Sequence, residues 1–135
     1  MKFYRIVTFV TLILATSAYA SQSNVVIYEQ FDDIKVVAVI NEKDIENSPK
    51  WHPGSEPLPL SVDDAIKAMH DFISQPKVIG SIEEIEIRTI NDFPGNWHYL
   101  IKVAASETDS RQHEMYLVLM SGKVIPAFIE PESIK

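Results

Sequence analysis

The sequence contains no cysteine, which excludes disulfide bonds, a thiol nucleophile and a thiolate metal site. Glycine is scarce: four glycines stand singly, so no glycine-rich loop that could hold a phosphate group is present. Basic residues are outnumbered, with 12 lysines and arginines against 19 aspartates and glutamates and a net charge of −7. Because such a chain repels phosphate backbones and anionic lipids, we expect it to bind no nucleic acid and no charged membrane surface.

Motifs that would indicate an enzyme are also missing. The four histidines are isolated, without an H-x-x-x-H or H-E-x-x-H pair. A zinc site built from His98, His113 and a glutamate is geometrically possible across a hairpin, but surface histidines are the simpler interpretation. Ser61 has no G-x-S-x-G elbow around it, and the paired acidic residues lack the spacing of a calcium loop. The sequence therefore predicts no enzyme activity, no catalytic residue, no metal and no cofactor.

The first 20 residues have the pattern of a secretory signal peptide. Lys2 and Arg5 precede the apolar run Ile6–Ala15, and Ala18-Tyr19-Ala20 ends in the small-x-small pattern that signal peptidase cuts. The run is too short to span a bilayer comfortably, although an uncleaved anchor is the alternative. We expect cleavage after Ala20, which leaves residues 21–135 as a single periplasmic or secreted domain without a stable membrane anchor.

Residues 24–40 predict two strands, Val25–Tyr28 and Ile34–Ile40, that form a hairpin or else one long strand bent at a bulge. The second strand is apolar on both faces, so we expect it to be well buried. Residues 41–59 form a long proline-rich loop without periodicity. Trp51 in this loop either pins it to the core or is displayed for a partner, and pinning is the simpler interpretation.

One amphipathic helix follows the loop. Ser61 is a suitable N-cap because its hydroxyl can accept a hydrogen bond from the backbone of Asp64. Apolar residues then recur at helical spacing, and Pro76 ends the run. This stripe, which we expect to pack on a sheet, consists of Ala65, Ile66, Met69, Phe72 and Ile73.

The remainder of the chain alternates with the period of a strand. The predicted strands are Ile85–Ile87, Trp97–Val103, Met115–Leu119 and a short closing strand, Val124–Ile125. Phe93–Asn96 and Ser121–Lys123 have the composition of turns between them. The predicted fold class is α+β, with one main helix packed on an antiparallel meander sheet of about four to five strands.

The helix and the three strands after it resemble a PepSY domain. The resemblance is carried by Ser61–Ala68, Ile85–Ile87, Trp97–Val103 and Met115–Ile125, which ends in a Ser-Gly-Lys-Val turn. It covers about half of the chain. Members of that family are exported or membrane-associated, and some are thought to restrain peptidases, so the resemblance implies a protein-interaction role without catalytic residues.

Two functional hypotheses follow. The first is an exported binding module that contacts another exported protein, for which we select Trp51, His52, Trp97 and Tyr99 as candidate partner-binding residues. The second is a binder of a small apolar ligand, with a pocket between helix and sheet roofed by residues 41–59. The same side chains would equally fill an ordinary core, so we predict a filled core.

Overall fold

The structure is a computed structural model that describes residues 23–31, 34–73, 81–104 and 114–130. The predicted signal peptide, Asp32, Pro76 and His113 lie outside these ranges. In chain order the elements are β1 (Asn24–Phe31), β2 (Ile34–Asn41), α1 (Glu42–Glu46), α2 (Val62–Phe72), β3 (Ile82–Ile90), β4 (Phe93–Val103), β5 (Glu114–Leu119), β6 (Val124–Pro126) and β7 (Phe128–Ile129). Among the described residues, no helix has the length and apolar character needed to cross a membrane.

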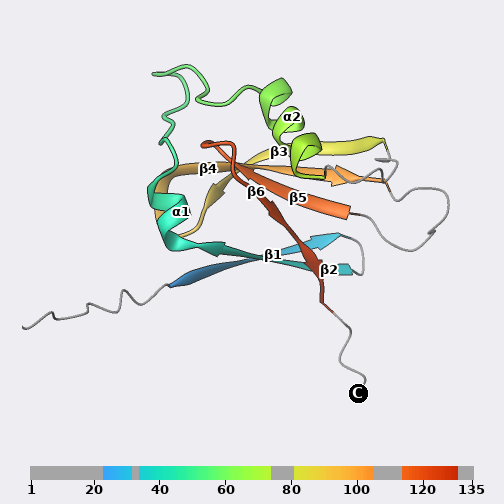
Figure 1. The fold of residues 1–135 in the computed structure, drawn as a ribbon. Coiled ribbons are helices and arrows are strands. Elements are labelled where there is room, and N and C mark those ends of the chain that lie inside the picture. Colours follow the sequence, from blue (N-terminus) through green and yellow to red (C-terminus); the bar gives the residue numbers. More distant parts are fainter. Residues whose placement is uncertain (1–22, 32–33, 74–80, 105–113, 131–135) are drawn as a thin grey trace, which may run out of the picture.

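The strands form two antiparallel sheets, of order β1-β2-β7 and β3-β4-β5-β6. Figure 1 shows α2 on one side of the second sheet and β1 and β2 on its other side, so that the second sheet is the middle layer. The predicted mixture of helix and antiparallel strands is therefore confirmed. The strands divide between two sheets, however, whereas we expected one meander of about four to five strands.

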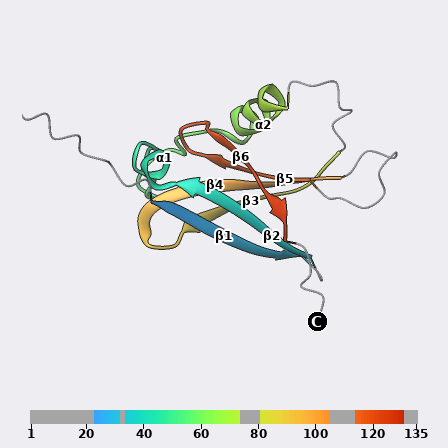
Figure 2. The same ribbon diagram turned by 60° about the horizontal axis from the view of Figure 1, so that its bottom comes forward.

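The two sheets are joined where the chain passes from β6 to β7. After Pro126 it leaves the middle sheet, and β7 pairs with β2 (Figure 2). The backbone N–H of Ala127 donates to the carbonyl of Met115 at 3.0 Å, and that of Glu130 donates to the carbonyl of Lys35 at 2.9 Å. Hydrogen bonds to both sheets thus fix the crossing and bring the N-terminal hairpin under the middle sheet.

The middle sheet buries a different set of side chains on each face, because successive residues of a strand point to opposite sides. The face toward β1 and β2 packs with Val36, Ala38, Ile40, Ile45, Ile90, Leu100, Met115, Leu117, Leu119 and Ile125. The face toward α2 packs with Ala65, Met69, Ile73, Tyr99, Ile101, Val103, Val118 and Met120. Leu100 and Ile101 are neighbours in β4 and belong to different cores.

Helix α2 begins as the sequence predicts, since the Ser61 hydroxyl accepts a hydrogen bond from the Asp64 N–H at 3.1 Å. Ala65 and Met69 of the predicted stripe are fully buried. Phe72 is not: it is 51 % exposed, so its placement in the core is wrong. Its ring meets Tyr116 edge-on, with 6.4 Å between the centroids, and leaves its other side in water.

The N-terminal strands form the predicted hairpin, with Asn24 opposite Asn41 and Tyr28 opposite Val37. This register excludes the single bent strand. Strand β2 is buried on one face only, because Ile40 is inaccessible while its neighbour Val39 is 44 % exposed. The expectation of burial on both faces is therefore wrong, since nothing in the described chain covers the outer side of this sheet.

Two segments that we expected to be irregular are ordered. Residues 42–46 of the long loop form helix α1, which Asn41 caps by accepting a hydrogen bond from the Lys43 N–H at 2.9 Å. Residues 93–96 belong to β4 rather than to a turn, and the chain reverses earlier, at Asp92, which has a φ of 66°. The predicted turn at Ser121–Lys123 is confirmed, with Gly122 at a φ of 89°.

Candidate functional site

The outer strands β1 and β3 border a groove of about 580 Å³. Within the described residues β1 pairs only with β2 and β3 only with β4, so each strand has one unpaired edge. Ligand sites in proteins commonly have volumes of about 300–1,000 Å³, and the groove falls in this range. Its lining consists of Val25, Val26, Ile27 and Tyr28 from β1 and of Ile87, Arg88, Thr89, Asn91, Trp97 and His98 from the β3–β4 hairpin.

The outer face of the first sheet adjoins this groove and is apolar. Tyr28 is 67 % exposed, Phe128 is 64 % exposed, and Val26 and Val39 are each more than two-fifths exposed. The strand register sets Val26 directly opposite Val39, so these side chains are neighbours across the sheet. A cluster of exposed apolar side chains on one sheet face is typical of an interaction surface.

Charged side chains lie on β3 beside the groove. The Arg88 guanidinium donates to the Glu86 carboxylate. This hydrogen bond is the main reason that the pKa of the Glu86 carboxyl is below its ordinary value, and a hydrogen bond with Glu84 adds to the effect. The same contact with Glu86, followed by desolvation, raises the pKa of the Glu84 carboxyl. The pKa values of the two carboxyls are therefore shifted in opposite directions.

Replacement of Arg88 by leucine should move the pKa of the Glu86 carboxyl upward, because the hydrogen bond that stabilises its anion is lost. A carboxyl whose pKa is lower in the folded than in the unfolded protein stabilises the fold at pH values above its unfolded pKa. This stabilisation is lost as the pH falls through the folded pKa. The variant should thus show a weaker acid dependence of unfolding below about pH 5. Carboxyl-carbon NMR titration measures the shift, and Arg88→Lys, which keeps the charge, should retain part of it. An unchanged Glu86 pKa in Arg88→Leu would contradict this assignment.

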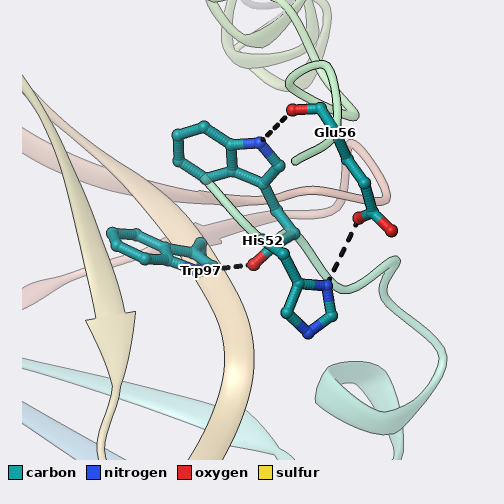
Figure 3. Close-up of polar contacts among 4 residues, drawn as sticks. His52, Glu56 and Trp97 are labelled. Carbon is teal, nitrogen blue, oxygen red and sulfur yellow. Dashed lines mark hydrogen bonds and ion pairs between the residues drawn. The ribbon is translucent and has the colours of Figure 1, made fainter. Parts of the chain in front are cut away.

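The Trp51 loop is attached to the start of β4 by two hydrogen bonds, and a third hydrogen bond lies within the loop. The Trp51 N–H donates to the Gly95 carbonyl at 2.9 Å, and the Trp97 indole N–H donates to the Trp51 carbonyl at 3.1 Å (Figure 3). The Trp51 indole N–H donates to the Glu56 carbonyl at 3.1 Å. The two indole rings also meet edge-on, with 5.1 Å between centroids. Trp51 is half-buried, and these contacts favour the interpretation that it pins the loop.

Asn96 holds the beginning of the same loop. Its side chain is 3 % exposed, and its amide nitrogen donates to the carbonyls of Ile45 at 2.9 Å and Ser48 at 3.4 Å. The Ser48 hydroxyl in turn accepts from the Ser121 N–H at 3.2 Å. One asparagine therefore ties α1 and the loop to the middle sheet. This role of Asn96 was not predicted, because Phe93–Asn96 has the composition of a turn.

The four candidate partner-binding residues are only partly brought together. Trp51 and Trp97 form the pair described above, and His52 lies on the surface with Nδ1 at 3.3 Å from the Glu56 carboxylate (Figure 3). Tyr99 is fully buried, and its hydroxyl donates to the Leu60 carbonyl, so it belongs to the core beneath α2. Burial is the main cause that raises the pKa of the Tyr99 hydroxyl, with Asp64 adding to it. Of the four, only Trp97 lines the groove.

The buried histidine of the groove was not expected. His98 is 1 % exposed, and its Nδ1 lies 3.2 Å from the Tyr99 carbonyl. The interpretation of all four histidines as surface residues is thus wrong for His98, because it shares with Leu100 the face of β4 that the N-terminal hairpin covers. Among the residues that the structure describes, no three histidine, aspartate or glutamate side chains gather as a metal site would require.

Comparison with protein families finds no family model that matches the chain, and comparisons with curated proteins and with solved structures likewise give no match. The similarity to PepSY domains therefore stays a prediction from the sequence.

Proposed function

We propose that this protein is an exported module that binds other proteins without catalysing a reaction, in the manner of the PepSY-like domains that restrain peptidases. The periplasm or the cell exterior is the compartment that the proposed signal peptide implies. The binding surface in this proposal is the β1–β3 groove together with the apolar outer face of β1, rather than the Trp51 loop alone.

The observation that carries the proposal is the coincidence of three features at β1. The strand has an unpaired edge, it borders a groove of about 580 Å³, and its outward side chains Val26 and Tyr28 are 42 % and 67 % exposed. Natural proteins usually cover or charge such an edge, because it can pair with another chain. From Val25 to Tyr28 the strand carries neither a charge nor a proline, so the edge is open to a partner.

The alternative, a small apolar ligand held between helix and sheet, has less support. The space between α2 and the middle sheet is occupied by Ala65, Met69 and Tyr99, which are each inaccessible to solvent. The groove of about 580 Å³ lies elsewhere and is lined in part by Arg88, Asn91 and His98. A lining that contains these polar side chains suits an apolar ligand less well than a lining of apolar and aromatic side chains would.

Site-specific photo-crosslinking in intact cells tests the proposal. We would place p-benzoylphenylalanine at Tyr28, beside the groove, and as a matched control at Lys67, which is exposed on α2. The expected result is a discrete protein adduct from position 28 and none from position 67. Equal adducts from both positions, or no adduct from position 28, would count against a partner on this face.

A further inference from the structure

The direction of the backbone groups at β1 can be derived from one hydrogen bond. The N–H of Glu42 donates to the carbonyl of Ser23 at 2.9 Å, and these two residues come directly before and after the pair Asn24 and Asn41, so they continue the register by one step. Hydrogen-bonded and non-bonded pairs alternate along an antiparallel ladder. The odd-numbered residues of β1 therefore turn their backbone groups toward β2, whereas Val26 and Tyr28 turn theirs toward the open edge.

The same alternation determines which backbone groups of β3 face its open edge. The N–H of Ala127 donates to the carbonyl of Met115, which sets the phase of β5. When the register is followed from β5 through β4 to β3, the backbone N–H and C=O groups of Arg88 face β4 and form hydrogen bonds with it. Its neighbours Ile87 and Thr89 consequently turn their N–H and C=O groups to the open edge. Both of these residues line the groove, as do Val26 and Tyr28.

We propose that the groove binds an extended peptide segment of a partner protein, which adds as a strand to the edge of β1 and is held on its other side by β3. This inference rests on the proposed function and specifies its partner. Backbone donors and acceptors at two-residue intervals match a strand, because a strand presents its own groups at the same spacing. A helix cannot match them, since its backbone groups are already bonded within it.

The surroundings define the chemistry of this segment. Side chains of the bound segment that lie opposite Val26 and Tyr28 would join the exposed apolar face of the first sheet. This position favours β-branched or aromatic residues in the segment. The chain has a net charge of −7, so a neutral or basic segment is favoured over an acidic one. A second folded copy is a poorer occupant, because the groove has β3 on its far side and the edge of a whole sheet would collide with it.

The probe is an eight-residue peptide, Lys-Val-Thr-Val-Thr-Val-Thr-Lys, added to the isotopically labelled protein, with amide hydrogen exchange followed residue by residue by NMR. We expect exchange to slow by about tenfold or more at Val26 and Tyr28, and also at Ile87 and Thr89. The odd-numbered amides of β1 serve as an internal control, since they already face β2. A peptide with glutamate at both ends should bind at least about threefold more weakly.

A pair of variants at one position isolates the backbone contribution. Tyr28→Pro removes the N–H that faces the groove without removing a bond to β2, and edge strands tolerate proline at such a position. Tyr28→Ala removes the side chain and keeps the N–H. We expect the proline variant to bind the probe about tenfold more weakly than the alanine variant, as the loss of a backbone hydrogen bond predicts.

Failure to bind the probe, protection at residues away from the two edges, or equal binding by both variants would overturn strand addition. Protection that appears without peptide and rises with protein concentration would assign the edge to a second copy and overturn it as well. If crosslinks at position 28 persist while the exchange pattern fails, the binding function stands and the strand mechanism falls. If both experiments fail, the binding face itself is wrong.

Discussion

Replacing Asn96 by aspartate should destabilise the folded protein by about 3–5 kcal/mol at neutral pH, which is the usual cost of an uncompensated buried charge. The amide nitrogen of Asn96 donates to two backbone carbonyls, at 2.9 and 3.4 Å. A carboxylate cannot donate, so two oxygen lone pairs would instead face the anion in a site that is 3 % exposed. Urea unfolding followed by tryptophan fluorescence measures the loss.

The matched variant is Asn96→Ala, which removes the donor and introduces no charge. It should cost about 1–3 kcal/mol, because the Ile45 and Ser48 carbonyls lose one partner. The pH dependence separates the two variants further. Burial raises the pKa of the introduced carboxyl above about 3.9, so the folded state holds its proton more tightly than the unfolded state. The aspartate variant should therefore regain stability as the pH falls through the raised pKa of its carboxyl, with recovery complete below about pH 4, whereas the alanine variant should show no such recovery.

A second consequence of the Asn96 substitution is local. The residue ties α1 and the Trp51 loop to β4, so its loss should loosen Trp51 before the core. We expect Trp51 to become accessible to a neutral quencher in Asn96→Asp, with Asn96→Ala in between. Equal stability of Asn96→Asp and the parent protein would show that these two hydrogen bonds do not hold the loop.

Local sequence patterns predicted the elements whose signals are short-range. Ser61 was identified as the cap because the cap and its partner Asp64 are three residues apart. The hairpin of β1 and β2 was predicted from two β-branched runs close together in the chain. Ile85 and Ile87 pack against the core under α2, as the period of a strand predicts, although Glu86 and Arg88 are half-buried as well. In each case the residues that decide the structure lie within one element or one turn.

The features that were missed depend on contacts between distant residues. Asn96 bonds to a carbonyl 51 positions away, and a Phe-Pro-Gly-Asn sequence reads locally as a turn. The groove exists because β7 pairs with β2 and brings β1 near β3, but β7 is two residues long and follows a proline. Phe72 has the correct helical spacing, yet its ring contacts Tyr116 at the edge of the core and stays half exposed. Periodicity shows which residues share a face and does not show where the opposing surface ends.

The division of the interior into two cores on either side of the middle sheet leads to the second large effect. Ile40 is fully buried on the side of the N-terminal hairpin, and Met69 is fully buried under α2. Each change to alanine removes a buried side chain and leaves a cavity, at a cost of about 2–5 kcal/mol. Phe72→Ala is the matched control on the same helix. It should cost about 1 kcal/mol or less, since roughly half of its ring surface already faces water.

Ile40→Ala and Met69→Ala should be additive to within about 0.5 kcal/mol when combined, because the two side chains belong to separate clusters. A combined loss of about 4–10 kcal/mol approaches the whole stability of a small domain, so the double variant should be largely unfolded at 37 °C.

Since β4 and β5 supply side chains to both cores, each single variant should still unfold in one transition, seen alike by circular dichroism and tryptophan fluorescence. Two separate transitions in Met69→Ala would show that α2 and the hairpin fold independently. A loss in Met69→Ala no larger than that in Phe72→Ala would mean that α2 does not bury its apolar stripe on the middle sheet.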